Sequence, residues 1–323
     1  MKRRTFIAGL ASAAAWPVVA RAQQQPARIR RIGVLLFAAE DRAAINPFLS
    51  GLEALGYIDG KTVAIAYREA AGNYERAPDL ANELVGLNPD VIFSFGGDLA
   101  HDIKNATATI PIIVVVSNDP VESGLVASLA RPGGNITGIT QVHDMLAGKS
   151  IELLKDIVPS VSRVAVLWNP DHADPEFRET QRGSRTLDVR LQSLEVRGPD
   201  DYEDAFQAAM RGRAEALIVI GARLQNLNRH RIGDFAEKNR LILVGVPAWL
   251  IEIGALFTYG PNVPELMKRA ATYVDKILKG AKPSDLPMQQ PTTFELHVNL
   301  KAARRLSITV PQTIIARADE VIE

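Results

Sequence analysis

Short apolar runs rich in valine and isoleucine alternate along the chain with longer stretches whose apolar residues recur every three or four positions. Continuous apolar runs are typical of strands buried on both faces, and the longer period is typical of helices that cover a sheet, as in NPFLSGLEALG at 46–56. The pattern therefore predicts an α/β fold with parallel sheets. The expected strands are 31–37, 63–67, 91–95, 112–117, 164–168, 191–196, 216–221 and 241–246.

The first four expected strands and the last four resemble each other. RRIGVLL at 30–36 opens the first set and SRVAVLW at 162–168 opens the second. YERA at 74–77 and YEDA at 202–205 each begin a helix that leads into the third strand of its set. Two such matches in the same order indicate two copies of one unit, so we expect two Rossmann-like, doubly wound lobes.

Three segments are expected to connect these lobes as a three-strand hinge, with a cleft where the carboxyl ends of the strands face each other. They lie near 135–141, near 255–262, and after 282–291, where FELHVNL reads as a strand. Small ligands usually bind in clefts of this kind. The predicted organisation is lobe 1 at 23–140 plus 260–290, and lobe 2 at 141–259 plus 291–323.

The N-terminus has the pattern of a secretory signal peptide, residues 1–22, with cleavage near Ala22. Paired Arg3 and Arg4 before a large apolar residue are typical of the twin-arginine pathway. A membrane anchor is the alternative, but the apolar run is broken by Pro17 and is shorter than the roughly 20 residues that span a bilayer. The sequence therefore predicts a periplasmic protein.

Charge and cysteine content narrow the function further. The chain has no cysteine, so an exported form depends on its core alone for stability. The 37 basic residues equal the 37 acidic ones, and four of the basic residues lie within the predicted signal peptide. No basic stripe remains for phosphates, and we expect no nucleic acid partner.

Motifs for catalysis and metal binding are missing from the sequence. There is no G-x-S-x-G elbow and no thiol nucleophile. The histidines show no metal-ligand spacing: His101, His143, His172, His230 and His297. We therefore predict no catalytic residue, metal or cofactor, although a hydrolase or isomerase acting in the cleft stays open as the weaker alternative.

The segment SFGGDLAHDI at 94–103 is a strand followed by two glycines and the start of a helix. Its free N–H groups suit a carboxylate or phosphate. Asp98, however, lies where a helix N-cap is expected, and a capping aspartate competes for those donors. Ligand contact at Gly97 and Asp98 and a plain turn-and-cap role both remain open.

The segment that follows the fourth strand contains SNDP at 117–120. Ser117, Asn118 and Asp119 end that strand where the cleft is expected, which makes them candidate ligand contacts. Pro120 suits the first turn of a helix, predicted over 121–130. RPGGN at 131–135 then ends the helix and turns the chain towards the hinge.

A polar loop follows the strand 164–168. Asn169 and Pro170 come directly after the strand and lie on the expected cleft side. The rest of NPDHADP lacks the pattern of a calcium loop, and we interpret it as a turn in which Asp174 caps the next helix.

Three segments, DPVESGLVASLARPGGNITG, PTTFELHVNLKAARRLSITVP and ARADEVIE, resemble ABC-transporter substrate-binding proteins of the family that includes tryptophan- and tyrosine-type binding proteins. The resemblance implies the type I periplasmic-binding-protein fold and a monomer that binds a small molecule and meets an ABC permease in the inner membrane. A sensory receptor that feeds a membrane kinase shares every feature of the sequence and is the alternative.

The same resemblance implies that the ligand contacts lie in the loops after the strands. The site residues expected on this basis are Phe37, Ala38, Asp41, Gly97, Asp98, Ser117, Asn118, Asp119, Thr140, Gln141, Asn169, Pro170, Arg223, Pro247 and Trp249.

Two segments of the second lobe depart from the family pattern: AWLIEIGALFTYG at 248–260 and GARLQNL at 221–227. The ligand of a relative is therefore not transferred. Arg223 is interpreted either as the bidentate partner of a ligand carboxylate or as a surface arginine. An aromatic or apolar carboxylate or amino acid is the expected solute.

Overall fold

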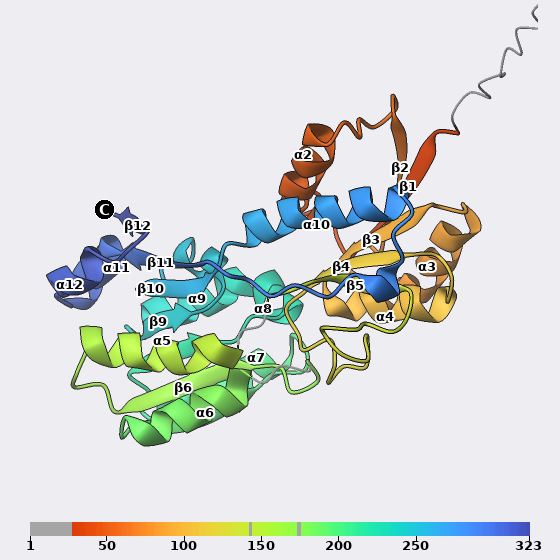
Figure 1. The fold of residues 1–323 in the computed structure, drawn as a ribbon. Coiled ribbons are helices and arrows are strands. Elements are labelled where there is room, and N and C mark those ends of the chain that lie inside the picture. The colour runs from red at the N-terminus through yellow and green to blue at the C-terminus, as the bar shows by residue number, and fades with distance from the viewer. Residues whose placement is uncertain (1–27, 142–143, 173–175) are drawn as a thin grey trace, which may run out of the picture.

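The computed structural model describes residues 28–141, 144–172 and 176–323. The predicted signal peptide, His143 and the predicted cap at Asp174 lie outside these ranges. The described residues form two sheets, which Figure 1 shows in two separate lobes. The strands are β1 (Arg30–Leu36), β2 (Val63–Glu69), β3 (Val91–Phe95), β4 (Ile112–Val116), β5 (Ile136–Thr140), β6 (Arg163–Trp168), β7 (Arg190–Glu195), β8 (Ala216–Val219), β9 (Ile242–Gly245), β10 (Phe257–Pro261), β11 (Phe294–Asn299) and β12 (Glu320–Ile322).

The first sheet has the strand order β2-β1-β3-β4-β5 and is parallel throughout. The second has the order β12-β11-β10-β9-β8-β6-β7, in which β11 runs antiparallel to β10 and the other pairs are parallel. All eight expected strands and the strand expected at FELHVNL are confirmed, as is the α/β fold of two doubly wound lobes.

Helices cover both faces of each sheet. We call the first sheet with α1 to α4 and α10 lobe 1, and the second sheet with the remaining helices lobe 2. The helices are α1 (Asp41–Ala44), α2 (Asn46–Ala54), α3 (Ala77–Gly86), α4 (Gly97–Ala106), α5 (Asp144–Ile157), α6 (Glu176–Thr186), α7 (Asp201–Arg211), α8 (Arg223–Leu227), α9 (Arg229–Lys238), α10 (Val263–Leu278), α11 (Leu300–Leu306) and α12 (Gln312–Ile315), with 3-10 turns η1 (Tyr74–Arg76), η2 (Ala248–Ile251) and η3 (Pro283–Asp285).

Alternation along β1 explains the layering of lobe 1. Ile32 and Val34 belong to the core cluster formed with α2 and α10, and Leu35 and Phe37 belong to the cluster formed with α3 and α4. Successive side chains of a strand point to opposite faces, so a continuous apolar run fills two cores at once. Strand β6 of lobe 2, which lies between β8 and β7, does the same between α5 on one face and α7 and α9 on the other.

The chain passes between the lobes at three places among the described residues: between β5 and α5, between β10 and α10, and between η3 and β11. Helix α10 returns to lobe 1 and packs against α2, where Gly51 allows a close approach because a Cβ there would lie 2.9 Å from the Cβ of Ala271. The third connection runs beside β5, since the N–H of Thr140 donates to the carbonyl of Gln289 over 2.9 Å.

The helix predicted over 121–130 is wrong. The segment forms turns instead, because one carboxylate oxygen of Asp119 accepts from the N–H groups of Val121 and Glu122 and Gly124 adopts φ +73°. A residue in the left-handed region cannot continue a right-handed helix. The segment is still anchored to the core of lobe 1 by buried Leu125 and Val126.

Of the two roles left open for Asp98, the N-cap role does not hold. Gly96, with φ +107°, occupies the N-cap position of α4, and Asp98 lies in the first turn, where its carboxylate accepts from Tyr74 and Arg223. None of the helices in the described part of the chain combines the length and the apolar character needed to cross a membrane.

Substitution of Gly138 tests how closely β5 packs beside β4. Its φ is +147°, and a Cβ would lie 2.0 Å from the carbonyl oxygen of Val114. We expect Gly138→Ala to lower the free energy of unfolding by about 3 kcal/mol, because the neighbouring backbone cannot move without breaking the sheet. The measurement is urea unfolding followed by circular dichroism.

Gly86→Ala is the matched control, because no atom lies within 4 Å of the added methyl group at the end of α3. It should be neutral or raise stability by up to about 1 kcal/mol. Equal effects of the two substitutions would contradict the role assigned to Gly138.

Candidate functional site

A cavity of about 560 Å³ lies between the two lobes. Its walls come mainly from the loops at the carboxyl ends of strands in both sheets, where open α/β sheets bind ligands. Lobe 1 contributes Phe95 at the end of β3 and Ser117 after β4. Lobe 2 contributes Asn169 after β6 and Trp249 after β9. The cavity is therefore completed by residues from both lobes.

Nine of the expected site residues line this cavity: Asp41, Gly97, Asp98, Ser117, Gln141, Asn169, Arg223, Pro247 and Trp249. The other six are not part of its walls: Phe37, Ala38, Asn118, Asp119, Thr140 and Pro170.

Several of these six support the wall from behind. Phe37, Ala38 and Thr140 are buried, and the N–H of Phe37 donates to Asp41 over 2.9 Å. Asn118 packs against the start of α4, because a Cβ on Gly97 would lie 2.2 Å from its Oδ1. Asp119 holds the turn that follows it.

Sequence reasoning missed other residues of the wall, including Tyr74, His172, Leu224 and Leu227. Tyr74 lies in the loop after β2, so applying the same strand-end rule to the strand at 63–67 would have found it. Leu224 and Leu227 lie in α8, a short helix that begins four residues after β8 ends, in a segment that was expected to be a loop.

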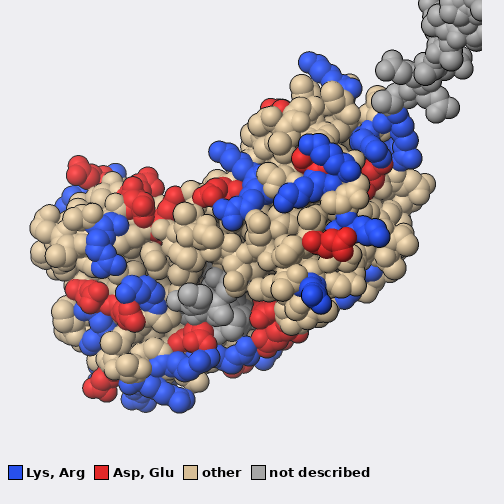
Figure 2. All heavy atoms as spheres, viewed as in Figure 1, with Lys and Arg blue, Asp and Glu red and all other residues tan. Residues whose placement is uncertain are grey.

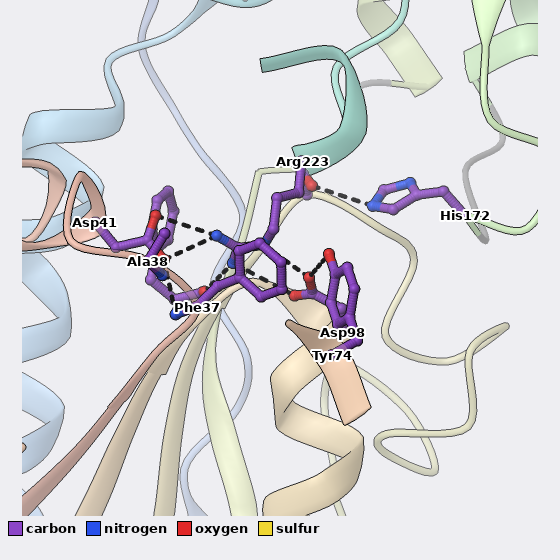
Figure 3. A network of polar contacts seen from close by, with 9 residues as sticks. Phe37, Ala38, Asp41, Tyr74, Asp98, His172 and Arg223 are labelled. Atoms are coloured by element: carbon purple, nitrogen blue, oxygen red, sulfur yellow. Dashed lines mark hydrogen bonds and ion pairs between the residues drawn. The ribbon is translucent and has the colours of Figure 1, made fainter. Parts of the chain in front are cut away.

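Arg223 begins α8 in lobe 2 and reaches across the cavity to lobe 1 (Figure 3). Its Nε donates to Asp98 Oδ2 over 2.7 Å and its Nη1 donates to Asp41 Oδ2 over 2.8 Å. Its Nη2 donates to the carbonyl oxygen of Phe95 over 2.9 Å. Only 13% of the side chain is exposed, so the interpretation as a surface arginine is wrong.

Both carboxylates are held by their own lobe as well. Asp41 accepts from the backbone of Phe37, and Tyr74 donates its hydroxyl to Asp98 over 2.6 Å. The Phe37 ring lies beneath the Arg223 guanidinium, 4.9 Å from its centre, and also contacts the ring of Tyr74. Lobe 1 thus presents an oriented acidic site to a cation from lobe 2.

These contacts set the charge states. Burial alone would raise the pKa of Asp98, but the Arg223 guanidinium outweighs it and holds that pKa below its usual value of 3.8. Burial likewise opposes the charge on Arg223, and the two aspartates raise its pKa above the ordinary value. Burial and the neighbouring Asp98 raise the pKa of Tyr74, which stays neutral. Two carboxylates facing one guanidinium leave this group with one net negative charge.

Two further contacts join the lobes beside the cavity. Ser117 Oγ lies 3.4 Å from Nε2 of His172. Arg178 of α6 pairs in a bidentate manner with Glu122, at 2.8 and 3.1 Å, with both side chains largely exposed. The structure therefore has its lobes in contact around the cavity.

The remaining wall suits binding of a partly apolar molecule. Phe95, Leu224, Val246 and Trp249 supply apolar surface, and Gln141 and Asn169 supply amide groups.

In the described ranges, no cluster of three or more His, Cys, Asp or Glu side chains is arranged to hold a metal ion. Figure 2 shows acidic and basic side chains interspersed on the visible face of both lobes.

Comparison with known proteins identifies the family. Residues 32–322 match the model of a family described as ABC transporter substrate binding protein. A curated relative, named tyrosine-binding protein, from Clostridioides difficile (strain R20291), is 25% identical over 278 residues, which cover 84% of this chain and 80% of the relative.

Solved structures share the fold. A conserved domain protein from Vibrio cholerae is 27% identical with a TM-score of 0.85, covering 91% of this chain and 100% of that chain. A domain from Streptococcus pneumonia in complex with L-Trp is 22% identical with a TM-score of 0.83 and the same coverage. The two-lobe architecture is that of type I periplasmic binding proteins.

The lowered pKa of Asp98 predicts a specific dependence of stability on pH. Its pKa in the folded protein lies below the unfolded value of 3.8, so its stabilising contribution is complete above that value and is lost as the pH falls through the folded pKa. We expect Asp98→Asn to reduce stability by about 1–2 kcal/mol at pH 7, and the difference from wild type to shrink below about pH 4.

Thermal unfolding between pH 3 and pH 7 measures this difference. Tyr74→Phe is the control, because it removes a hydrogen bond to Asp98 without removing a charge. It should keep most of the wild-type loss of stability in acid, because Arg223 lowers the pKa of Asp98 more than Tyr74 does. Identical pH profiles for wild type and Asp98→Asn would show that the ion pair does not stabilise the fold.

Proposed function

This chain belongs to the ABC transporter substrate-binding protein family, and from that premise we propose that it is the periplasmic solute-binding component of an ABC import system. It clamps a small solute between its lobes and presents the closed form to a permease in the inner membrane. The observation that supports this function is the 560 Å³ cavity with walls from both lobes.

Closure of the hinge is the proposed mechanism. A solute that contacts both lobes at once binds the closed form more tightly than the open form and shifts the population towards it. The connecting segments between the lobes supply the hinge, and Gln141 lies in the first of them and in the cavity wall. Binding and release without chemical change are expected.

The proposed solute is an aromatic or apolar carboxylate or amino acid. Trp249, Phe95 and Tyr74 in the cavity wall support an aromatic or apolar body. The names of the relatives, one a tyrosine-binding protein and one solved with L-Trp, support an amino acid of this kind.

Export and chain organisation complete the proposal. Proteins of this family meet their solute outside the cytoplasmic membrane, which supports removal of residues 1–22 as a twin-arginine signal peptide. We also propose that the mature protein acts as a monomer, with lobe 1 formed by 23–140 plus 260–290 and lobe 2 by 141–259 plus 291–323, except that residues 260 and 261, at the end of β10, go with the second sheet.

A thermal-shift screen of amino acids, aromatic acids, nucleosides and sugars tests the function. We expect stabilisation by aromatic or apolar acids or amino acids, with the compound recovered unchanged. Trp249→Ala should weaken binding of the compound found by about tenfold or more, because it removes aromatic surface from the cavity wall. Recovery of a product in place of the compound would identify an enzyme.

Trp168→Phe is the control for Trp249→Ala. Trp168 stacks on Phe177 and donates to Ser193, and it is not part of the cavity wall. The affinity of this variant for the compound should be unchanged. Because the third tryptophan of the chain lies in the predicted signal peptide, the tryptophan fluorescence of the mature variant should report Trp249 alone.

Export is tested by replacing Arg3 and Arg4 with lysine in a host that has the twin-arginine pathway. The wild-type chain should reach the periplasm and begin at Gln23, and the variant should stay in the cytoplasm. Unchanged export of the variant would assign the signal to the general secretory route.

A further inference from the structure

All three nitrogens of the Arg223 guanidinium are engaged by lobe 1 in this structure. Nε donates to Asp98, Nη1 donates to both oxygens of Asp41 at 2.8 and 3.1 Å, and Nη2 donates to the carbonyl of Phe95, with Asp98 Oδ1 at 3.5 Å. Each of the three guanidinium nitrogens therefore already donates to at least one of these acceptors.

Every one of these acceptors belongs to lobe 1, whereas Arg223 belongs to lobe 2. The contacts therefore exist only while the lobes are together. A solute carboxylate that approached Arg223 would compete with two aspartates that are held by the backbone of Phe37 and by Tyr74, and both of them would repel it.

We propose that Arg223 is a positioning residue that closes the two lobes on each other through Asp41 and Asp98, and that it does not receive a solute carboxylate. The guanidinium occupies the acidic site of lobe 1 as a cationic ligand would. Part of the free energy of closure then comes from the protein itself, and the solute is recognised by the rest of the cavity wall.

Burial makes this bridge effective. The side chains of Asp41 and Asp98 are only 12% and 26% exposed with the lobes together, and such burial is unfavourable unless a cation enters with them. The pair formed by Arg178 and Glu122 spans the same cleft with good geometry, but the two side chains are 57% and 44% exposed. Exposed pairs contribute little, so this rim pair provides a matched comparison within the same molecule.

The experiment measures the distance between the lobes in the mature chain without solute. The chain has no cysteine, so Val121→Cys and Gln181→Cys, adjacent to the two rims, provide attachment points for spin labels and pulsed electron paramagnetic resonance. We expect a short distance in the labelled parent, a shift to longer distances with Arg223→Ala, partial recovery with Arg223→Lys, and no shift with Arg178→Ala.

A second measurement compares L-tryptophan with its carboxamide as probes. This part rests on the proposed function. Arg223→Ala should weaken the binding of both probes by the same factor, roughly 10- to 100-fold. The reason is that the substitution lowers the fraction of closed protein and removes no contact to the carboxylate.

Two results would overturn the inference. One is an unchanged distance between the lobes in Arg223→Ala, and the other is loss of affinity for L-tryptophan alone with the carboxamide unaffected, which would make Arg223 the carboxylate receptor. If neither probe binds the parent, the choice of solute fails, while the distances in the solute-free protein still decide the role of Arg223.

Discussion

The carboxyl ends of the parallel strands in each lobe meet at one edge of their sheet, and the site depends on this geometry. Each strand is followed by a loop or a helix start at that edge. Segments that are distant in sequence, such as those carrying Asp41, Asp98 and Ser117, therefore lie close together because of the sheet itself. The second lobe repeats the arrangement, and the connections between the lobes turn the two edges towards each other. A cavity with walls from both units follows from the topology.

Electrostatics then decides which arrangement of the lobes is favourable. Charged groups leave water only when they gain partners, and the aspartates of lobe 1 gain theirs from Arg223 of lobe 2. Tyr74 and the backbone near Phe37 orient those carboxylates beforehand, which reduces the ordering that closure requires. The carboxylate of Asp41 also holds its own loop, by accepting from the backbone of Phe37. Arg223, which binds the same carboxylate, therefore stabilises one wall of the cavity as well as joining the lobes.

Local sequence patterns were reliable where burial repeats along a strand and unreliable where one residue adopts an unusual conformation. The expected strands are all present because a run such as 112–117 has no other way to bury its side chains on two faces. The segment 121–130 follows Pro120 and has apolar residues in helix-like positions, yet Gly124 and the carboxylate of Asp119 make it turn. An aspartate followed by a proline can begin either a helix or a turn, so the local pattern does not decide between them.

The sequence by itself determined the layered α/β architecture, the duplication, and most of the strand-end loops that line the cavity, because these follow from periodicity and from the short range of chain connections. Only the tertiary structure decided the partner of Arg223. That side chain lies 125 positions from Asp98 and 182 from Asp41 along the chain, and it meets them only because two separately folded lobes close on each other. A contact between lobes does not change the pattern of apolar and polar residues in either segment. It is therefore seen only when the three-dimensional positions of both segments are known.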